Sequence, residues 1–438
     1  MSNNLVPEVI AAVDQLFDEQ VSFLQDLVRF DSTRVKEGAA QEFMAAALEQ
    51  LGYDLDVWQI DIEDIAHLPG YSPVSGPYDD AQNVVATHTP RIATGKSLVL
   101  NGHIDVVPIG PTDIWHKDPY SAHIEDGWMY GRGSGDMKAG LGANLYALRA
   151  LKQLGYQPAA KLVFQSVVEE ECTGNGALAC LARGHVGDAV LIPEPFAETL
   201  VTAQVGVLWF QVQLQGLPTH VAYASQGANA IEGAIPIVDA LHAMEARWNE
   251  ASNRHHAYCH HEHALNLNIG RIEGGDWTSS VPAWCRFDVR MGMFPGQDLE
   301  QAKQDIVDTV MAAAQSNAFL RDNPPQVKFE GFQAEGYVLA DDHSPNALQA
   351  VADLEQAHRQ VNGEELAKKP ITATTDARFF GLYGDTPALV YGPKASAIHG
   401  FDECVELESI RRVTQTTALF IAQWCGLEKC EQETNDEQ

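Results

Sequence analysis

The sequence predicts an α/β fold whose mostly parallel sheet is interrupted by an inserted α+β domain. Over roughly the first 200 residues, short apolar segments alternate with amphipathic helical segments, as in strand–helix–strand units. From about residue 204 the order becomes β-α-β-β-α-β, which is ferredoxin-like. After residue 335, helix and strand alternate again. The expected organisation is therefore one domain formed by residues 1–203 and 334–438, with residues 204–333 inserted into it.

The elements of the first part follow from hydrophobic periodicity. Apolar residues at helical spacing predict helices over residues 8–29 and 41–51, the second ending at Gly52. A third helix, 139–154, separates two apolar segments and predicts a crossover between parallel strands. The predicted buried strands are 97–101, 161–168 and 189–192. In open α/β sheets, functional sites lie at the carboxyl ends of such strands.

The inserted part alternates strands and helices in the order given above. The predicted helices are 229–248 and 298–315, and the predicted strands are 207–214, 265–272, 283–291 and 326–332. The polar, acidic segment after Leu427 is expected to fray.

Composition excludes several classes of partner. The 438 residues include 60 Asp and Glu against 28 Lys and Arg, giving a net charge of -32. Such a surface repels nucleic acid and anionic membranes. The sequence has no apolar stretch of about 20 residues and no secretory signal at its start. The odd number of cysteines, without any CxxC, suits reduced thiols and predicts a cytoplasmic protein.

Acids and histidines follow the predicted strands or lie in glycine-flanked loops. Three oxygen and two nitrogen donors of this kind suit two divalent metals, with zinc expected and cobalt as the alternative. The predicted metal ligands are His103, Asp136, Glu171, Glu194 and His399.

Neighbouring acids predict the chemistry of this site. Asp136 can give one carboxylate oxygen to each metal. Asp105 lies two residues after His103 on an extended segment, where it can hold the second ring nitrogen of His103. Glu170, beside a ligand, is free to act as general base on a metal-bridged water. The three consecutive acids 169–171 would repel one another strongly without a cation.

Two other segments allow different interpretations. The glycine-rich run 131–135 could cradle a phosphate, which predicts nucleotide affinity, but it lacks the GxxxxGK(S/T) order. The histidine-rich segment 254–263 has no HExxH order and lies in the inserted part, so we interpret it as a polar loop that binds metal only adventitiously.

The full set of motifs resembles the M20 family of metallopeptidases and amidohydrolases, which includes acetylornithine deacetylase, succinyl-diaminopimelate desuccinylase, aminoacylase-1 and glutamate carboxypeptidase. The shared features are strand–HxD, GxGxxDxK, an acid triplet before a glycine turn, a later acid and a late histidine. The resemblance implies that His103 and Glu194 bind one zinc, that Glu171 and His399 bind the other, and that Asp136 bridges them.

The resemblance also implies a base and a backbone conformation. Glu170 matches the family's general base, while the alternative register would make Glu169 the base. The Asp136–Met137 peptide bond is expected to be cis.

By the same resemblance, the inserted domain is a lid through which the chain forms a homodimer. His220 would reach the partner's active site and polarise the scissile carbonyl, and Arg290 would bind a substrate carboxylate. Ser279 stands where the family often has Asn. The residues matching substrate-side segments are Asn229, Ser279, Arg290 and Gly392.

The expected function is hydrolysis of linear amide bonds, foremost as a deacylase of N-acyl amino acids similar to acetylornithine deacetylase. A dipeptidase or carboxypeptidase of the same family is the alternative, because no chain feature separates the two. A non-catalytic metal-site binding protein is the third interpretation, although the intact Glu170 argues against it.

Overall fold

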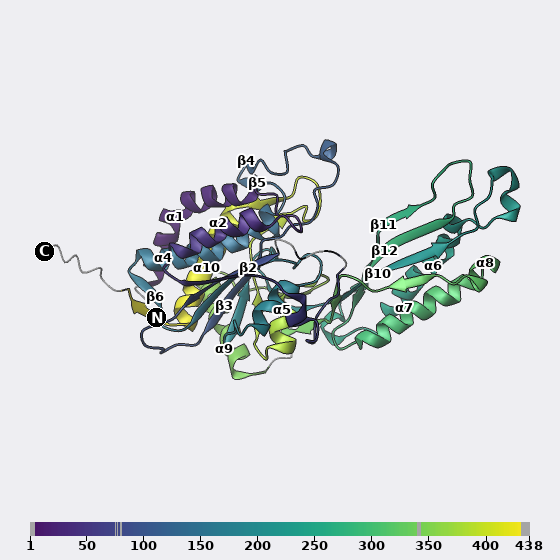
Figure 1. Ribbon diagram of the computed structural model, residues 1–438. Helices are drawn as coiled ribbons and strands as arrows, with labels where there is room; N and C mark the ends of the chain where they lie inside the picture. The colour runs from purple at the N-terminus through teal and green to yellow at the C-terminus, as the bar shows by residue number, and fades with distance from the viewer. Residues whose placement is uncertain (1–4, 75, 77, 79–80, 340–342, 431–438) are drawn as a thin grey trace.

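The protein has two lobes joined by a narrow waist (Figure 1). The computed structural model describes residues 5–74, 76, 78, 81–339 and 343–430. The N- and C-terminal parts of the chain share the larger lobe, and the middle of the chain forms the smaller one. Each lobe has its own cluster of buried apolar side chains.

A six-stranded sheet in the order β1-β2-β7-β3-β8-β17 forms the centre of the larger lobe. Its central strand β3 pairs in parallel with β7 and β8, and β17 pairs in parallel with β8. The sheet is mixed, because β1 and β2 are antiparallel to their neighbours. The strands are β1 (Asp54–Gln59), β2 (Gln82–His88), β3 (Leu98–His103), β7 (Leu162–Val167), β8 (Ala189–Ile192) and β17 (Ala388–Val390).

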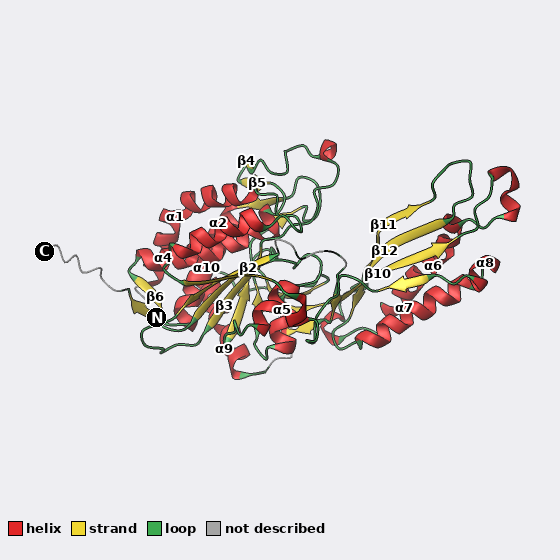
Figure 2. Cartoon of the chain, in the orientation of Figure 1, coloured by secondary structure: helices red, strands yellow, loops and turns green. Residues whose placement is uncertain are grey.

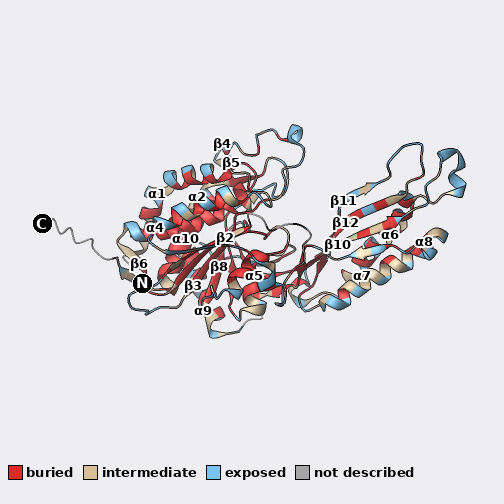
Figure 3. Cartoon of the chain, viewed as in Figure 1, coloured by how far each residue is buried: buried red, intermediate tan, exposed pale blue. Residues whose placement is uncertain are grey.

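The sequence analysis did not predict β1 and β2. In β1 no residue is buried, and only Asp56 and Trp58 are partly buried. This edge position hides the apolar run that identifies a central strand. By contrast, β3, β7 and β8 are buried along their whole length, which explains why their apolar segments were recognisable (Figure 3).

Helices cover this sheet on both sides (Figure 2). Helices α1, α4 and α10 pack against one another over one face, and α5 lies on the other. The helices of this lobe are α1 (Leu5–Val28), α2 (Gly38–Glu49), α3 (Ile62–Ile65), α4 (Ala139–Gln153), α5 (Asn175–Ala182), α9 (Pro345–Asn362) and α10 (Leu407–Trp424). The predicted helices 8–29, 41–51 and 139–154 correspond to α1, α2 and α4.

The smaller lobe is a four-stranded antiparallel sheet in the order β11-β12-β10-β13, with β14 also pairing to β10. Helices α6 and α7 lie on one face (Figure 2). Along β10, buried residues alternate with partly exposed ones because only one face is covered. The order β10-α6-β11-β12-α7-β13 matches the predicted ferredoxin-like order. These elements are β10 (Gly206–Gln215), α6 (Ala230–Trp248), β11 (Leu267–Gly274), β12 (Trp284–Met293), α7 (Leu299–Ala314), α8 (Ala318–Asp322), β13 (Gln326–Lys328) and β14 (Gln333–Ala334).

Three small sheets complete the structure. One contains β15 (Tyr337–Val338), β9 (Leu200–Gln204) and β16 (Lys368–Ile371). Another contains β18 (Ala395–Ser396), β19 (Cys404–Glu406), β5 (Trp128–Tyr130) and β4 (His123–Glu125). In the third, β20 (Leu427–Lys429) pairs with β6 (Tyr156–Pro158).

The pairing of β20 corrects the prediction that the chain frays directly after Leu427; residues 431–438 lie outside the described part. The described helices include none with the length and apolar character needed to cross a bilayer.

Candidate active site

The predicted ligands meet at one edge of the central sheet. His103 is the last residue of β3, Glu171 follows β7 by four residues, and Glu194 follows β8 by two. These strands are parallel, so their carboxyl ends lie together. Asp136 lies in the turn before α4, and His399 lies in the loop between β18 and β19.

The two oxygens of Asp136 face different histidines. Its Oδ1 lies 3.1 Å from Nε2 of His103, and its Oδ2 lies 3.4 Å from Nε2 of His399. Oε2 of Glu171 is 3.1 Å from the same nitrogen of His399. Asp136 thus stands between the two histidines, in the arrangement that a bridging carboxylate requires.

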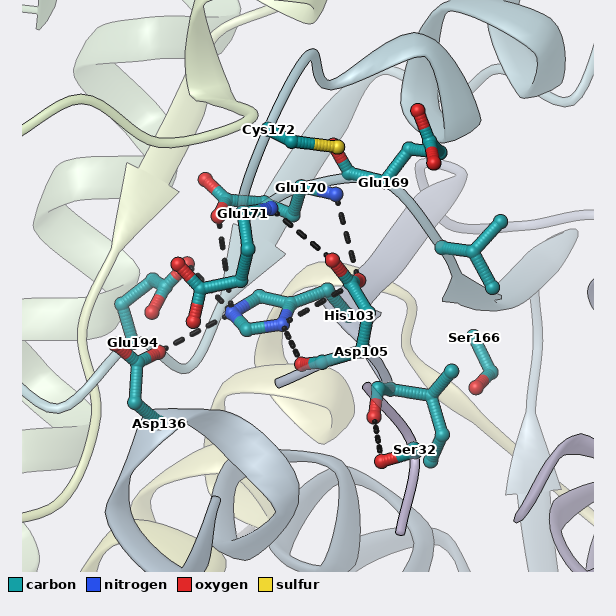
Figure 4. A network of polar contacts seen from close by, with 12 residues as sticks. Ser32, His103, Asp105, Asp136, Ser166, Glu169, Glu170, Glu171, Cys172 and Glu194 are labelled. Atoms are coloured by element: carbon teal, nitrogen blue, oxygen red, sulfur yellow. Dashed lines mark hydrogen bonds and ion pairs between the residues drawn. The ribbon is translucent and has the colours of Figure 1, made fainter. Parts of the chain in front are cut away.

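Two further carboxylates lie beside His103 (Figure 4). Oε1 of Glu194 is 3.8 Å and Oε2 of Glu170 is 3.9 Å from Nε2 of His103. All three residues are buried, whereas the side chain of His399 is 52% exposed. The site therefore has a closed side at His103 and an open side at His399.

The second ring nitrogen of His103 is held differently from the prediction. Its Nδ1 lies 2.9 Å from the main-chain oxygen of Asp105, and the Asp105 carboxylate is 3.7 Å away. That carboxylate instead accepts hydrogen bonds from the main-chain N–H groups of Glu170 and Glu171, at 3.3 and 3.1 Å. Asp105 therefore fixes the loop after β7, because this loop offers it two main-chain donors.

The side chains of the three consecutive acids, residues 169–171, point in different directions. Oε1 of Glu169 forms an ion pair with Nε of Arg34 at 2.6 Å, and its other carboxylate oxygen accepts a hydrogen bond from the Thr173 hydroxyl. Glu170 and Glu171 instead face the histidines. The repulsion expected among the three acids is thus relieved in part by Arg34.

The charges of this cluster shift its protonation equilibria. Burial opposes the charged form of His103, but its hydrogen bond to Asp136 and the charges of Glu194 and Glu170 raise its pKa well above the ordinary value. His399 is likewise raised to a pKa of about 11, against the effect of its burial, by Asp136 and Glu171. Burial raises the pKa of Glu170 and Glu194 well above their usual range.

The donor set fits divalent metals. Tetrahedral zinc with ligand bonds of about 2.0–2.2 Å places neighbouring donor atoms about 3.3–3.6 Å apart. The nitrogen of each histidine lies 3.1–3.8 Å from the ligand carboxylates that face it. Ligand atoms of His103, Asp136 and Glu171 lie within 4.8 Å of one another, as do those of His103, Glu170 and Glu194. The predicted cis conformation of the Asp136–Met137 peptide bond is confirmed.

The predicted lid residues lie apart from this cluster. His220 is exposed on the smaller lobe, and its Nδ1 accepts a hydrogen bond from the main chain of Ala222. Within the described residues, no hydrogen bond or ion pair links His220 to the five predicted ligands. Ser279 lies next to Ser280, which forms an isolated bridge with His220.

The other predicted substrate-side residues have structural contacts. The side chain of Asn229 caps α6 by accepting from the main chains of Ile231 and Glu232. Arg290 donates to the main-chain oxygens of Asn266 and Thr372, so it is engaged where the lobes meet. A Cβ on Gly392 would stand 2.3 Å from the main-chain oxygen of Glu194, so a side chain there would displace the segment that follows β8.

Two further pairs of buried charged residues lie near the site: Asp376 and Arg378, in a segment that resembles a substrate-side segment of the family, and Arg132 and Glu403, which the sequence analysis missed. Asp376 is 2% exposed, and the charge of Arg378 opposes the effect of burial, which raises the pKa of Asp376 to about 7. Arg132 and Glu403 form a buried ion pair behind the loops of Asp136 and His399. For Arg132 and Glu403 the available signal was that each lies in a glycine-containing segment that also carries a predicted ligand.

Glu37 is a buried acid behind the site and permits a test by pH. Its side chain is fully buried, and burial together with the charge of Asp105 raises its pKa from 4.5 to about 8, against the effect of the main-chain N–H groups of Glu37 and Lys36. Because the folded state holds this proton more tightly than the unfolded state, the stabilising effect is complete below pH 4.5 and is lost as pH rises through about 8.

In chelator, the free energy of unfolding of the wild type should therefore fall relative to Glu37→Gln across that window. The expected relative loss is on the order of a few kcal/mol. Denaturant unfolding at pH 5, 6.5 and 8 measures it, and parallel pH profiles for the two proteins would contradict it.

Comparisons with known proteins agree with this fold. Two curated relatives are N-formyl-4-amino-5-aminomethyl-2-methylpyrimidine deformylases. The one from Halalkalibacterium halodurans is 26% identical and the alignment covers 97% of this chain and 99% of the relative. The one from Bacillus subtilis is 25% identical, and the alignment covers 95% of this chain and 97% of the relative. The structure of the dipeptidase Dug1p from Saccharomyces cerevisiae has the same fold, with a TM-score of 0.76, 16% identity and coverage of 96% and 98%.

The fold, the site and these relatives define a hydrolase of amide bonds. The chain belongs to the peptidase family M20/M25/M40, whose model matches residues 99–423. The predicted family is thereby confirmed. Enzymes of this family depend on metal, in agreement with the donor set around His103 and Asp136.

Proposed function

We propose that the protein removes a short acyl group from a primary amine, and that the five predicted ligands hold two divalent metals, zinc or cobalt. The observation that carries the proposal is that Glu170 lies beside His103, while the two oxygens of Asp136 contact two different histidines. Asp136 faces both histidines, and Glu170 stands buried at 3.9 Å from His103. Among the described residues, this is the only ion pair of Glu170, so its carboxylate is available to a substrate-side proton.

The chain's own residues perform the proton transfers. Two metals in such a site lower the pKa of a bound water. Glu170 accepts the proton of the attacking water and returns it to the nitrogen of the leaving amine. The buried surroundings favour the protonated form of Glu170, which suits the second transfer. Glu169 is unsuited to this role because Arg34 already holds its carboxylate.

Substrate preference is inferred from the relatives and from Arg290. Both curated relatives act, by name, on an N-formyl amine whose amine part is an aminomethylpyrimidine. Arg290, predicted to hold a substrate carboxylate, donates instead to two main-chain oxygens. We therefore favour a short acyl group and do not require that the amine be an amino acid.

A panel of amides tests this proposal. Zinc- or cobalt-loaded protein is assayed with N-formyl and N-acetyl derivatives of aminomethylpyrimidines, benzylamine and amino acids, and with dipeptides. A kcat/KM at least tenfold higher for N-formyl or N-acetyl amines than for dipeptides is expected. Preferential cleavage of dipeptides would support the alternative function, and no hydrolysis of any amide would exclude both.

We further propose a cytoplasmic homodimer formed through the smaller lobe. All seven cysteines are free in the structure, which suits a reducing compartment. His220 lies on a tip with several exposed apolar residues, namely Leu217, Val221, Tyr223, Ile231 and Trp277. A second copy seated there would cover this surface and bring His220 to the other active site.

Mixed dimers test this arrangement. His220→Ala and Glu170→Ala proteins should each be inactive, because each lacks one group in every site. After denaturation and joint refolding, the mixed dimer should recover activity, because one of its two sites has both groups intact. Verified mixed dimers without recovered activity would show that His220 does not act across subunits. Refolded mixtures of each variant with itself are the controls.

A further inference from the structure

The loops that carry Asp136 and His399 are adjacent in the fold although they are far apart in the sequence. Strands β5 and β19 are antiparallel, and Tyr130 at the end of β5 pairs with Cys404 at the start of β19. The segment leading to Asp136 therefore leaves this sheet where the segment coming from His399 enters it. The main-chain N–H of Gly131 donates to the carbonyl of Glu403 at 2.9 Å, which extends the pairing into the loops.

A buried ion pair lies between these two loops. Nη1 of Arg132 is 2.5 Å from Oε2 of Glu403, and the two side chains are 2% and 1% exposed. Burying two charges is unfavourable unless their remaining polar atoms also find partners. Nη2 of Arg132 and Oε1 of Glu403 find main-chain partners in the ligand loops, whereas Nε of Arg132 has no hydrogen-bond partner among the described residues.

Each member of the pair reaches toward one predicted ligand. Oε1 of Glu403 accepts hydrogen bonds from the main-chain N–H groups of Gly135 and Asp136, both at 3.1 Å. Nη2 of Arg132 donates to the main-chain oxygen of Gly400 at 3.1 Å, directly after His399. Gly135 permits this close packing, because a Cβ there would stand 2.5 Å from the Cβ of Ala395.

The loop of His399 needs such support. His399 has a φ of 61°, in the left-handed region that is unfavourable for a residue with a side chain, and so does Ala397 at 53°. Its imidazole is half exposed and has less surrounding protein to hold it than the buried ring of His103. The backbone conformation of this segment is not favoured by its residues, so the contact of Arg132 with Gly400 is needed to restrain it.

We propose that Arg132 and Glu403 are positioning residues that set the spacing between Asp136 and His399, and so the affinity of the metal position formed by Glu171 and His399. The inference rests on the proposed two-metal site. It predicts an unequal effect: Asp136 serves both positions, but His103 and Glu194 are held by the central sheet, whereas the loop of His399 also depends on the contact of Arg132 with Gly400. Partners that orient ligands typically change metal affinity 10- to 100-fold when they are replaced.

Metal titration of matched variants tests this inference. Glu403→Gln keeps an acceptor near Gly135 but removes the charge that holds Arg132. Arg132→Lys keeps the positive charge but lacks the fork that reaches both Glu403 and Gly400, and it serves if Glu403→Gln does not fold. Arg183→Lys is the control, since Arg183 forms a two-contact ion pair with Asp56 at a more exposed position. Competition with a chelator gives the affinity of each Co²⁺ equivalent, and the visible Co²⁺ spectrum reports its coordination.

The wild type and Arg183→Lys should bind two equivalents with the same affinities. In Glu403→Gln and Arg132→Lys, one equivalent should weaken 10- to 100-fold, while the other changes by less than about threefold. If both variants bind two Co²⁺ equivalents with wild-type affinities, this inference is overturned but the two-metal proposal is not. Equal weakening of both equivalents, together with a lower unfolding temperature in chelator, would show a merely structural pair and would also overturn it. A single equivalent in the wild type would overturn the two-metal proposal and this inference with it.

Discussion

Replacing Glu170 by Gln is expected to lower kcat by about 10²- to 10⁴-fold, the range that general acid–base catalysis contributes. The Gln side chain has nearly the same size but cannot accept a proton from water or return one to the leaving amine. KM and metal content should stay close to those of the wild type, because the proposal places no metal on Glu170. Steady-state kinetics and metal analysis of the purified variant measure both quantities.

Glu169→Gln is the control for this experiment. The Glu169 carboxylate is turned toward Arg34, so its replacement should retain most of the activity and affect mainly local packing. If Glu169→Gln were inactive with full metal content while Glu170→Gln lost metal, the assignment of the two acids would be off by one residue.

Replacing Asp136 by Ala is expected to abolish tight binding of both metals and to reduce turnover to background. Asp136 is the one predicted ligand whose two oxygens face both histidines, so its loss weakens both positions. Removing it also leaves the imidazoles of His103 and His399 without the carboxylate that they share. Isothermal titration with Zn²⁺ in a competing chelator measures the loss.

Stability gives an independent measure of the same change. A ligand present at 1,000 times its Kd stabilises the folded state by about 4 kcal/mol. Zn²⁺ should therefore raise the unfolding temperature of the wild type and leave that of Asp136→Ala nearly unchanged. Glu171→Ala, which removes a ligand from one position only, should keep part of the response. An equal response of Asp136→Ala and the wild type would contradict the bridging role.

The sequence was sufficient to locate the central strands and the residues that follow them. The segments that became β3, β7 and β8 are apolar throughout because both faces of these strands are buried. Parallel strands buried in this way must expose their loops at their ends, so His103 and Glu194 could be placed before any coordinates. Strand β1 escaped the sequence analysis because this edge strand has no buried residue and so carries a weaker apolar pattern. Strand β2 is an interior strand, but its buried apolar segment is short and lies between polar residues.

The tertiary structure decided how the charges of the site are divided. The sequence contains three consecutive acids, and only the approach of Arg34 from 135 residues away turns Glu169 aside. The sequence also placed the Asp105 carboxylate on the ring of His103, yet two main-chain donors of the loop after β7 compete for it at shorter distances.

By itself the sequence determined the family and the central strands with their crossover helix, and it predicted the donor atoms, because these follow from local periodicity and from short motifs. Only the tertiary structure decided which acid faces which histidine and which buried pair joins the two ligand loops. Arg132 and Glu403 are 271 residues apart. Such a contact arises from the pairing of β5 with β19, and the free energy that stabilises it comes from burial and from main-chain partners that no local pattern records.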